Sequence, residues 1–152
     1  MDSDCAPPGG AEPVEPSREE AGLFFELRTT ASTSGIPTIR TVAADLAARA
    51  DFDLDSIDDL RMAVDDLCAM LTRIAVDNTM LSCAFTVLPG RIEVAAEVEV
   101  DDVRDRLSTG SFGWRVLECL ANEVSAVAVP AAPGRAGRVR VTLMKDVGRE
   151  QP

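Results

Sequence analysis

The sequence contains no histidine and no tyrosine, and only one tryptophan among its 152 residues. Without histidine the commonest zinc ligand is missing, and Ser-His catalytic pairs and histidine-based acid–base steps are excluded. Any chemistry must therefore use carboxylates, lysine, serine, threonine or backbone groups.

Long apolar runs are missing too, because no stretch approaches the roughly 20 residues that a membrane-spanning helix requires. The N-terminus also lacks the basic and then apolar segments of a secretory signal. We therefore expect a cytoplasmic protein that does not enter a membrane.

The four cysteines form no C-x-x-C pair, which is the common spacing of metal and redox sites. Three of them lie in apolar segments, where a thiol packs like a small apolar side chain. We expect reduced thiols rather than disulfides or metal ligands at Cys5, Cys68, Cys83 and Cys119.

Basic residues are outnumbered, with 15 Lys and Arg against 26 Asp and Glu, so the net charge is −11. Nucleic-acid binding needs clustered cations that neutralise phosphates, and we therefore expect no direct nucleic-acid contact. A basic partner protein suits this charge better, although an acidic surface also serves solubility.

Length and a hydrophobic fraction of 46% are typical of one globular domain. The first 20 residues are rich in proline, glycine and acidic side chains, so they can bury too little to offset the entropy of ordering. We predict a disordered tail over 1–20, one domain over 21–147 and a frayed end over 148–152.

The segment from Asp53 to Val76 has the longest unbroken helical period in the chain. Apolar residues recur there every three or four positions, which predicts a helix with one buried stripe. Asp55 or Ser56 is expected to cap its first turn. The stripe contains Ile57, Leu60, Val64, Leu67, Cys68, Leu71, Ile74 and Ala75.

The opposite face of this predicted helix is acidic. A carboxylate there either stays hydrated on a solvated surface or meets a ligand, and the pattern alone fits both. The acidic residues are Asp58, Asp59, Asp65 and Asp66.

The other elements follow from alternation and turn chemistry. A helix is predicted from Pro37 to Arg49, with Ser34 as its cap, and another from Trp114 to Asn122. Pro89-Gly90 predicts a hairpin turn. Strands are predicted over 23–30, 80–88, 91–100, 124–129 and 138–145.

The predicted order of elements is β, α, α, β, β, α, β, β. Strands joined by short turns, with the helices grouped between them, are typical of an α+β protein. We predict a two-layer sandwich, in which a mostly antiparallel mixed sheet carries its helices on one face.

Three segments together resemble the RsbW-type anti-sigma factors of the GHKL ATPase superfamily. The most specific is IDDLRMAVDDLC at 57–68; GSFG at 110–113 and VRVTL at 139–143 accompany it. The resemblance covers roughly residues 23–145 and implies the Bergerat-type, histidine-kinase-like ATPase fold. It also implies ATP and Mg²⁺ as cofactors, held between helices and sheet.

The resemblance implies partner switching. Such proteins sequester a stress- or sporulation-type sigma factor and are released by a STAS-type anti-anti-sigma protein, which many of them phosphorylate on serine or threonine. They are often homodimers. Our leading expectation is an anti-sigma binding protein; the alternatives are an active ATP-dependent serine kinase and an ATP sensor without catalysis.

Two residues of the long helix depart from the family pattern. Asp66 takes the place of a general-base glutamate, and its side chain is one methylene shorter. A misplacement of about 1 Å can cost on the order of a hundredfold in rate. Met70 stands where the family has an asparagine that holds Mg²⁺, and a thioether is a poor ligand for a hard cation. Met70 is also explained as a core residue at the edge of the stripe.

The remaining nucleotide motifs are incomplete. Asp101 is the candidate for contact with the adenine amino group, but the family's D-x-G-x-G motif is absent there. Backbone amides at Gly110, Ser111 and Gly113 either bind phosphates at a helix N-terminus or merely form a turn. Arg104 and Arg106 fall in the expected lid.

The scaffold is thus retained while its catalytic motifs are eroded. Phosphoryl transfer depends on precise positioning and on Mg²⁺ electrostatics, so it is more sensitive to these changes than protein binding. We therefore expect ATP and Mg²⁺ binding to be weak or lost, and partner binding to persist.

Overall fold

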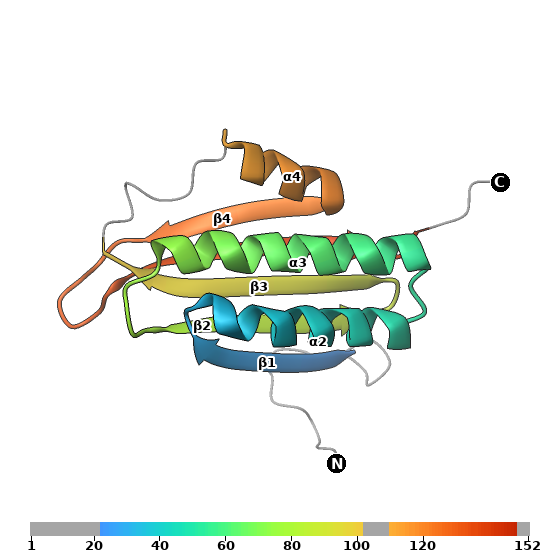
Figure 1. Ribbon diagram of the computed structural model, residues 1–152, viewed down its shortest axis with the longest axis horizontal. Coiled ribbons are helices and arrows are strands. Elements are labelled where there is room, and N and C mark those ends of the chain that lie inside the picture. The colour runs from blue at the N-terminus through green and yellow to red at the C-terminus, as the bar shows by residue number, and fades with distance from the viewer. Residues whose placement is uncertain (1–21, 102–109, 149–152) are drawn as a thin grey trace, which may run out of the picture.

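The computed structural model describes residues 22–101 and 110–148 of the chain. Within these residues one five-stranded sheet forms a layer, and the α-helices lie against one of its faces (Figure 1). The predicted element order and the α+β class are confirmed. The strands are β1 (Leu23–Thr30), β2 (Met80–Leu88), β3 (Arg91–Val100), β4 (Glu123–Val129) and β5 (Gly137–Asp146). The helices are a short 3-10 helix, η1 (Thr33–Gly35), followed by α2 (Ile36–Arg49), α3 (Leu54–Ile74) and α4 (Phe112–Leu120).

The sheet order is β1-β2-β3-β5-β4. We predicted a mostly antiparallel mixed sheet; in the described residues all neighbouring strands pair antiparallel, so no parallel pair is present there. The predicted β2–β3 hairpin is confirmed, and Gly90 in its turn has a φ of +72°. Glycine suits this position because other L-residues meet a steric penalty at positive φ.

The core lies between α3 and the central strands. Alternate residues of β3, from Ile92 to Val100, are fully or almost fully buried, as the period of a strand with one covered face requires. The predicted stripe of α3 faces them, and its five central members are buried. These are Leu60, Val64, Leu67, Cys68 and Leu71.

The first turn of α3 is capped by a residue other than those predicted. Asp53 is the N-cap, and its Oδ2 accepts a hydrogen bond from the backbone amide of Ser56 at 3.2 Å. Asp53 has the extended conformation of a capping residue, whereas Asp55 and Ser56 already lie inside the helix. The sequence offered several adjacent capping residues, and only the backbone conformation selects one.

The cap predicted for α2 was also wrong. Gly35 is its N-cap, without a side-chain hydrogen bond, because the 3-10 turn η1 leads directly into the helix. The Ser34 hydroxyl instead forms a hydrogen bond with the Ser32 hydroxyl at 2.8 Å. Pro37 does lie in the first turn, as predicted.

The cysteine predictions were partly correct. Cys68 and Cys83 are buried free thiols, and the contact between them, together with burial, raises the pKa of Cys83. Cys119 is free but exposed on α4, so the prediction that it packs in the core was wrong. Cys5 and the predicted tail over 1–20 lie outside the described residues. Within the described part of the chain, no helix is long and apolar enough to span a membrane.

Candidate functional site

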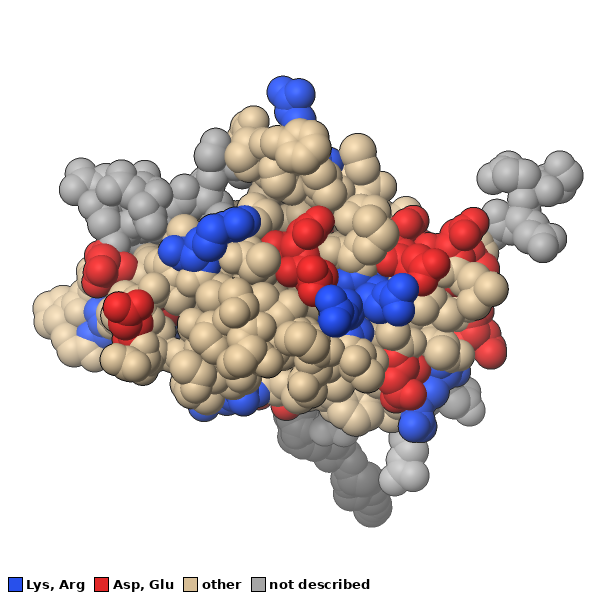
Figure 2. All heavy atoms as spheres, in the orientation of Figure 1, with Lys and Arg blue, Asp and Glu red and all other residues tan. Residues whose placement is uncertain are grey.

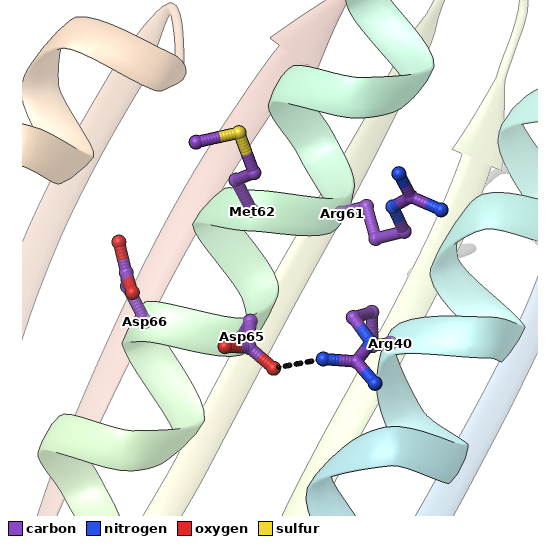
Figure 3. A pocket seen from close by; sticks show the side chains of 5 residues that line it. All are labelled: Arg40, Arg61, Met62, Asp65 and Asp66. Atoms are coloured by element: carbon purple, nitrogen blue, oxygen red, sulfur yellow. Dashed lines mark hydrogen bonds and ion pairs between the residues drawn. The ribbon is translucent and has the colours of Figure 1, made fainter.

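The helix layer carries a hollow of about 490 Å³. It opens on a face where acidic and basic side chains are interspersed rather than gathered into one acidic patch (Figure 2). One lining residue comes from α2 and the others come from α3 (Figure 3). They are Arg40, Arg61, Met62, Asp65 and Asp66.

The two adjacent carboxylates of this hollow have different environments. Arg40 reaches across from α2 and forms an ion pair with Asp65, with Nη1 and Oδ1 2.9 Å apart. Asp66 points to the other side of α3, as Met62 does (Figure 3). Among the described residues the carboxylate of Asp66 has no hydrogen-bond or ion-pair partner. Its carboxylate is therefore the more available of the two for a ligand or a proton.

The pKa of Asp66 is raised above its ordinary value. Partial burial is the main cause because it disfavours the charged form, and repulsion from Asp65 acts in the same direction. Arg73 opposes both effects. A carboxylate with a raised pKa is a stronger base, which suits the role predicted for Asp66.

Met70 lies one helical turn beyond Asp66, on the same face of α3. It is only 8% exposed and belongs to the hydrophobic core. A Cβ atom built on Gly113 would lie 3.5 Å from Sδ of Met70, so the thioether packs against the first turn of α4. The position of the expected Mg²⁺ ligand is therefore filled by an apolar contact.

The glycine-containing segment opens α4, as predicted. The helix begins at Phe112, two residues before the predicted start at Trp114. Ser111 is the N-cap, and its hydroxyl accepts a hydrogen bond from the amide of Trp114 at 3.1 Å. The amides of Phe112 and Gly113 precede the first intrahelical hydrogen bonds. These two groups could meet an anion, while the Ser111 side chain serves the helix.

The predicted site residues do not line one common hollow. Of the predicted site residues, only Asp66 lines the hollow on α3. The glycine segment contacts that helix at Met70 instead. Asp101 is exposed after the end of β3. Arg104 and Arg106, in the expected lid, lie outside the described residues. Sequence reasoning missed Arg40 of α2 and Arg61 of α3 as lining residues, because no local pattern shows which side chains meet where α2 packs against α3.

The far end of α4 is held by a partly buried lysine that sequence reasoning also missed. Lys145 on β5 is 12% exposed, and its Nζ donates a hydrogen bond to the Leu120 carbonyl at 2.9 Å. The same nitrogen pairs with Asp59 of α3 at 3.3 Å. A cation on the last carbonyls of a helix both satisfies them and complements the helix dipole.

The described residues do not fit a magnesium–nucleotide complex well. The family-pattern ligand position holds the buried Met70 thioether, and Mg²⁺ requires oxygen ligands. Among the described residues, no group of three or more histidine, cysteine, aspartate or glutamate side chains is placed to hold a metal ion. Of the two carboxylates that line the hollow, only that of Asp66 has no ion-pair partner among the described residues.

Comparison with solved structures defines the class of protein. The chain matches a crystal structure of the RsbU and RsbW domains of a Mycobacterium tuberculosis protein with a TM-score of 0.60 and 16% identity. The match covers 84% of this chain and 33% of that one, so the chain spans about a third of that protein. The fold is thus that of the RsbW domain in that structure, an α+β sandwich with one helix layer.

Curated relatives then give the family. The anti-sigma-F factor RsbW of Mycobacterium tuberculosis is 34% identical over 123 residues, which cover 80% of this chain and 72% of that protein. The serine-protein kinase RsbW of Bacillus licheniformis is 25% identical over 127 residues, covering 70% of this chain and 79% of the relative. No family model matches the sequence. The chain belongs to the RsbW family.

Proposed function

We propose that this protein is an anti-sigma factor, which sequesters an alternative sigma factor and is released by a STAS-type anti-anti-sigma protein. The observation that carries this proposal is the 34% identity to an anti-sigma-F factor over 80% of the chain. The retained sheet and helix layer supports it, because a protein partner is recognised by an extended surface rather than by a few catalytic groups.

The site residues favour binding over catalysis. Phosphoryl transfer is almost entirely positioning and electrostatic stabilisation, and much of the latter comes from Mg²⁺. Here Asp66 has a shorter side chain than the glutamate of the family pattern, and Met70 offers no hard ligand. A protein interface tolerates both changes.

Electrostatics should affect the rate of association. With a net charge of −11, the chain attracts a basic sigma-factor surface over a distance set by the Debye length. The interspersed charges in Figure 2 point to local pairing rather than to one acidic patch. We therefore expect salt to slow association more than it speeds dissociation.

Co-purification tests the proposal. The full chain would be immobilised, and each alternative sigma factor of the source organism would be applied at low and at high salt. We expect one sigma factor to be retained at low salt and to be displaced by an unphosphorylated STAS protein. Retention of no sigma factor at low salt would overturn the proposal.

A second candidate function is serine-kinase activity. Two observations favour it: the relative named serine-protein kinase RsbW, and the unpaired carboxylate of Asp66 with its raised pKa. Labelled ATP and a STAS protein would be incubated with the wild type, Asp66→Ala and Asp65→Ala. Transfer that is lost only in Asp66→Ala supports the kinase. Absence of transfer from the wild type removes it.

A further inference from the structure

The contact between Met70 and Gly113 joins the two helices that would border a nucleotide. Relative to a Cβ atom built on Gly113, Sδ of Met70 lies at 3.5 Å and its Cε at 3.9 Å, which are ordinary van der Waals distances. Methionine is flexible and polarizable, so it fills an irregular gap between packed elements well. The side chain therefore bridges α3 and the first turn of α4.

The protein's own side chains hold α4 at both ends. At its start, Met70 packs on Gly113; at its end, Lys145 binds the Leu120 carbonyl and Asp59 of α3. Between these points Trp114 and Leu117 are buried, with exposures of 4% and 0%. No contact in this arrangement requires a bound ligand.

We propose that Met70 is a positioning residue that fastens the start of α4 to α3, so that this protein holds its nucleotide-site helix in place without a magnesium–nucleotide complex. The presence of methionine at position 70 then explains both the poor fit of the site to Mg²⁺ and the packing of the thioether on α4. The inference rests on the proposed function in one respect: sigma-factor binding should not need ATP.

Trp114 provides a direct measurement. It is the only tryptophan in a chain without tyrosine, and it follows Gly113 in α4, so its fluorescence reports on this helix alone. For the full-length wild type we expect a blue emission maximum that Mg-ATP does not shift. We also expect amide exchange in α4 to be equal with Mg-ATP and with EDTA.

Variants at one position test the role of the thioether. Met70→Ala should shift the Trp114 emission to the red and speed amide exchange in α4 about tenfold, while far-UV circular dichroism shows that the fold persists. Met70→Leu conserves volume and should behave like the wild type. If Met70→Ala does not fold, amide exchange in α4 of the wild type, compared with Mg-ATP and with EDTA, still tests the proposal.

Three results would overturn the inference. One is an emission shift or slower α4 exchange when Mg-ATP is added to the wild type. Another is a Met70→Ala variant that folds and keeps wild-type emission and exchange. The third is a sigma factor that binds with Mg-ATP but not with EDTA, which would leave the proposed function intact. Failure to bind any sigma factor, with α4 held as described, would instead overturn only the proposed function.

Discussion

Arg40 on α2 donates a hydrogen bond to the carboxylate of Asp65 on α3, with Nη1 and Oδ1 2.9 Å apart. This contact ties together the two long helices of the layer. It also engages one of two adjacent carboxylates and leaves its neighbour, Asp66, without an ion-pair partner among the described residues. The consequences of that difference can be measured.

Asp65→Asn should lower the free energy of unfolding by no more than about 1 kcal/mol, because exposed ion pairs contribute little. The side chains of the pair are 41% and 37% exposed. A double-mutant cycle with Arg40→Met, followed by urea denaturation, measures the coupling. A coupling energy well above about 1 kcal/mol would contradict the expectation that this exposed ion pair contributes little to stability.

Asp66→Asn should make the protein more stable at neutral pH. Because the folded state raises the pKa of Asp66, it binds this proton more tightly than the unfolded state does. Wild-type stability therefore falls as the pH rises from about 3.9 through the folded-state pKa. The Asn variant lacks this loss, so its advantage in melting temperature should appear above that window and vanish at about pH 3. An equal advantage at both pH values would show another cause.

Asp53→Ala should lower the melting temperature, because Asp53 has two structural roles. Its Oδ2 accepts the Ser56 amide at the start of α3, and its Oδ1 accepts the Gly148 amide beyond β5 at 2.9 Å. Asp55→Ala is the matched control, since Asp55 is an exposed acid in the same turn. The control should change the melting temperature less.

The effect of Asp53→Ala should also depend on pH. Hydrogen bonds, first of all from the Ser56 side chain, lower the pKa of Asp53 in the folded state. Its stabilising contribution is therefore complete above about pH 3.9 and is lost as the pH falls through the folded-state pKa. The difference in melting temperature between the wild type and Asp53→Ala should become smaller in acid. A difference that grows in acid would show that the Asp53 carboxylate does not stabilise the folded state in this way.

Two glycine-to-alanine substitutions should differ in their effect on the free energy of unfolding. Gly90→Ala forces alanine into a φ of +72° and should cost about 1–2 kcal/mol. Gly113 does not have a positive φ, and a new Cβ would meet Met70 at an ordinary 3.5 Å. Gly113→Ala should therefore be neutral or stabilise by up to about 1 kcal/mol. Urea denaturation of both variants measures this contrast.

Local patterns predicted most of the fold. Alternation along Arg91–Val100 and the Pro89-Gly90 turn led to the correct hairpin, because strand period and turn chemistry act over a few neighbouring residues. The same holds for the stripe of α3, whose period requires one face to be buried. Caps were less predictable, since Asp53, Asp55 and Ser56 all have suitable side chains and only the backbone conformation distinguishes them.

The candidate site was less accessible to this reasoning. The residue types at Asp66 and Met70 are enough to indicate a doubtful general base and a poor metal ligand. The residues that surround Asp66 and Met70 in the fold cannot be predicted from the neighbouring sequence. That Met70 meets Gly113, and that Lys145 meets both Asp59 and Leu120, depends on how α4 packs against α3 and β5.

The order of the residues alone therefore accounts for the helices, the strands, the acidic balance and the chemistry that the chain lacks, because each follows from side-chain type and short-range period. Packing between distant segments decided the rest: which aspartate is paired, and what fills the space beside Gly113. Such contacts form only when the sheet order β1-β2-β3-β5-β4 brings residues far apart in the chain together, so their free energy belongs to the folded structure as a whole.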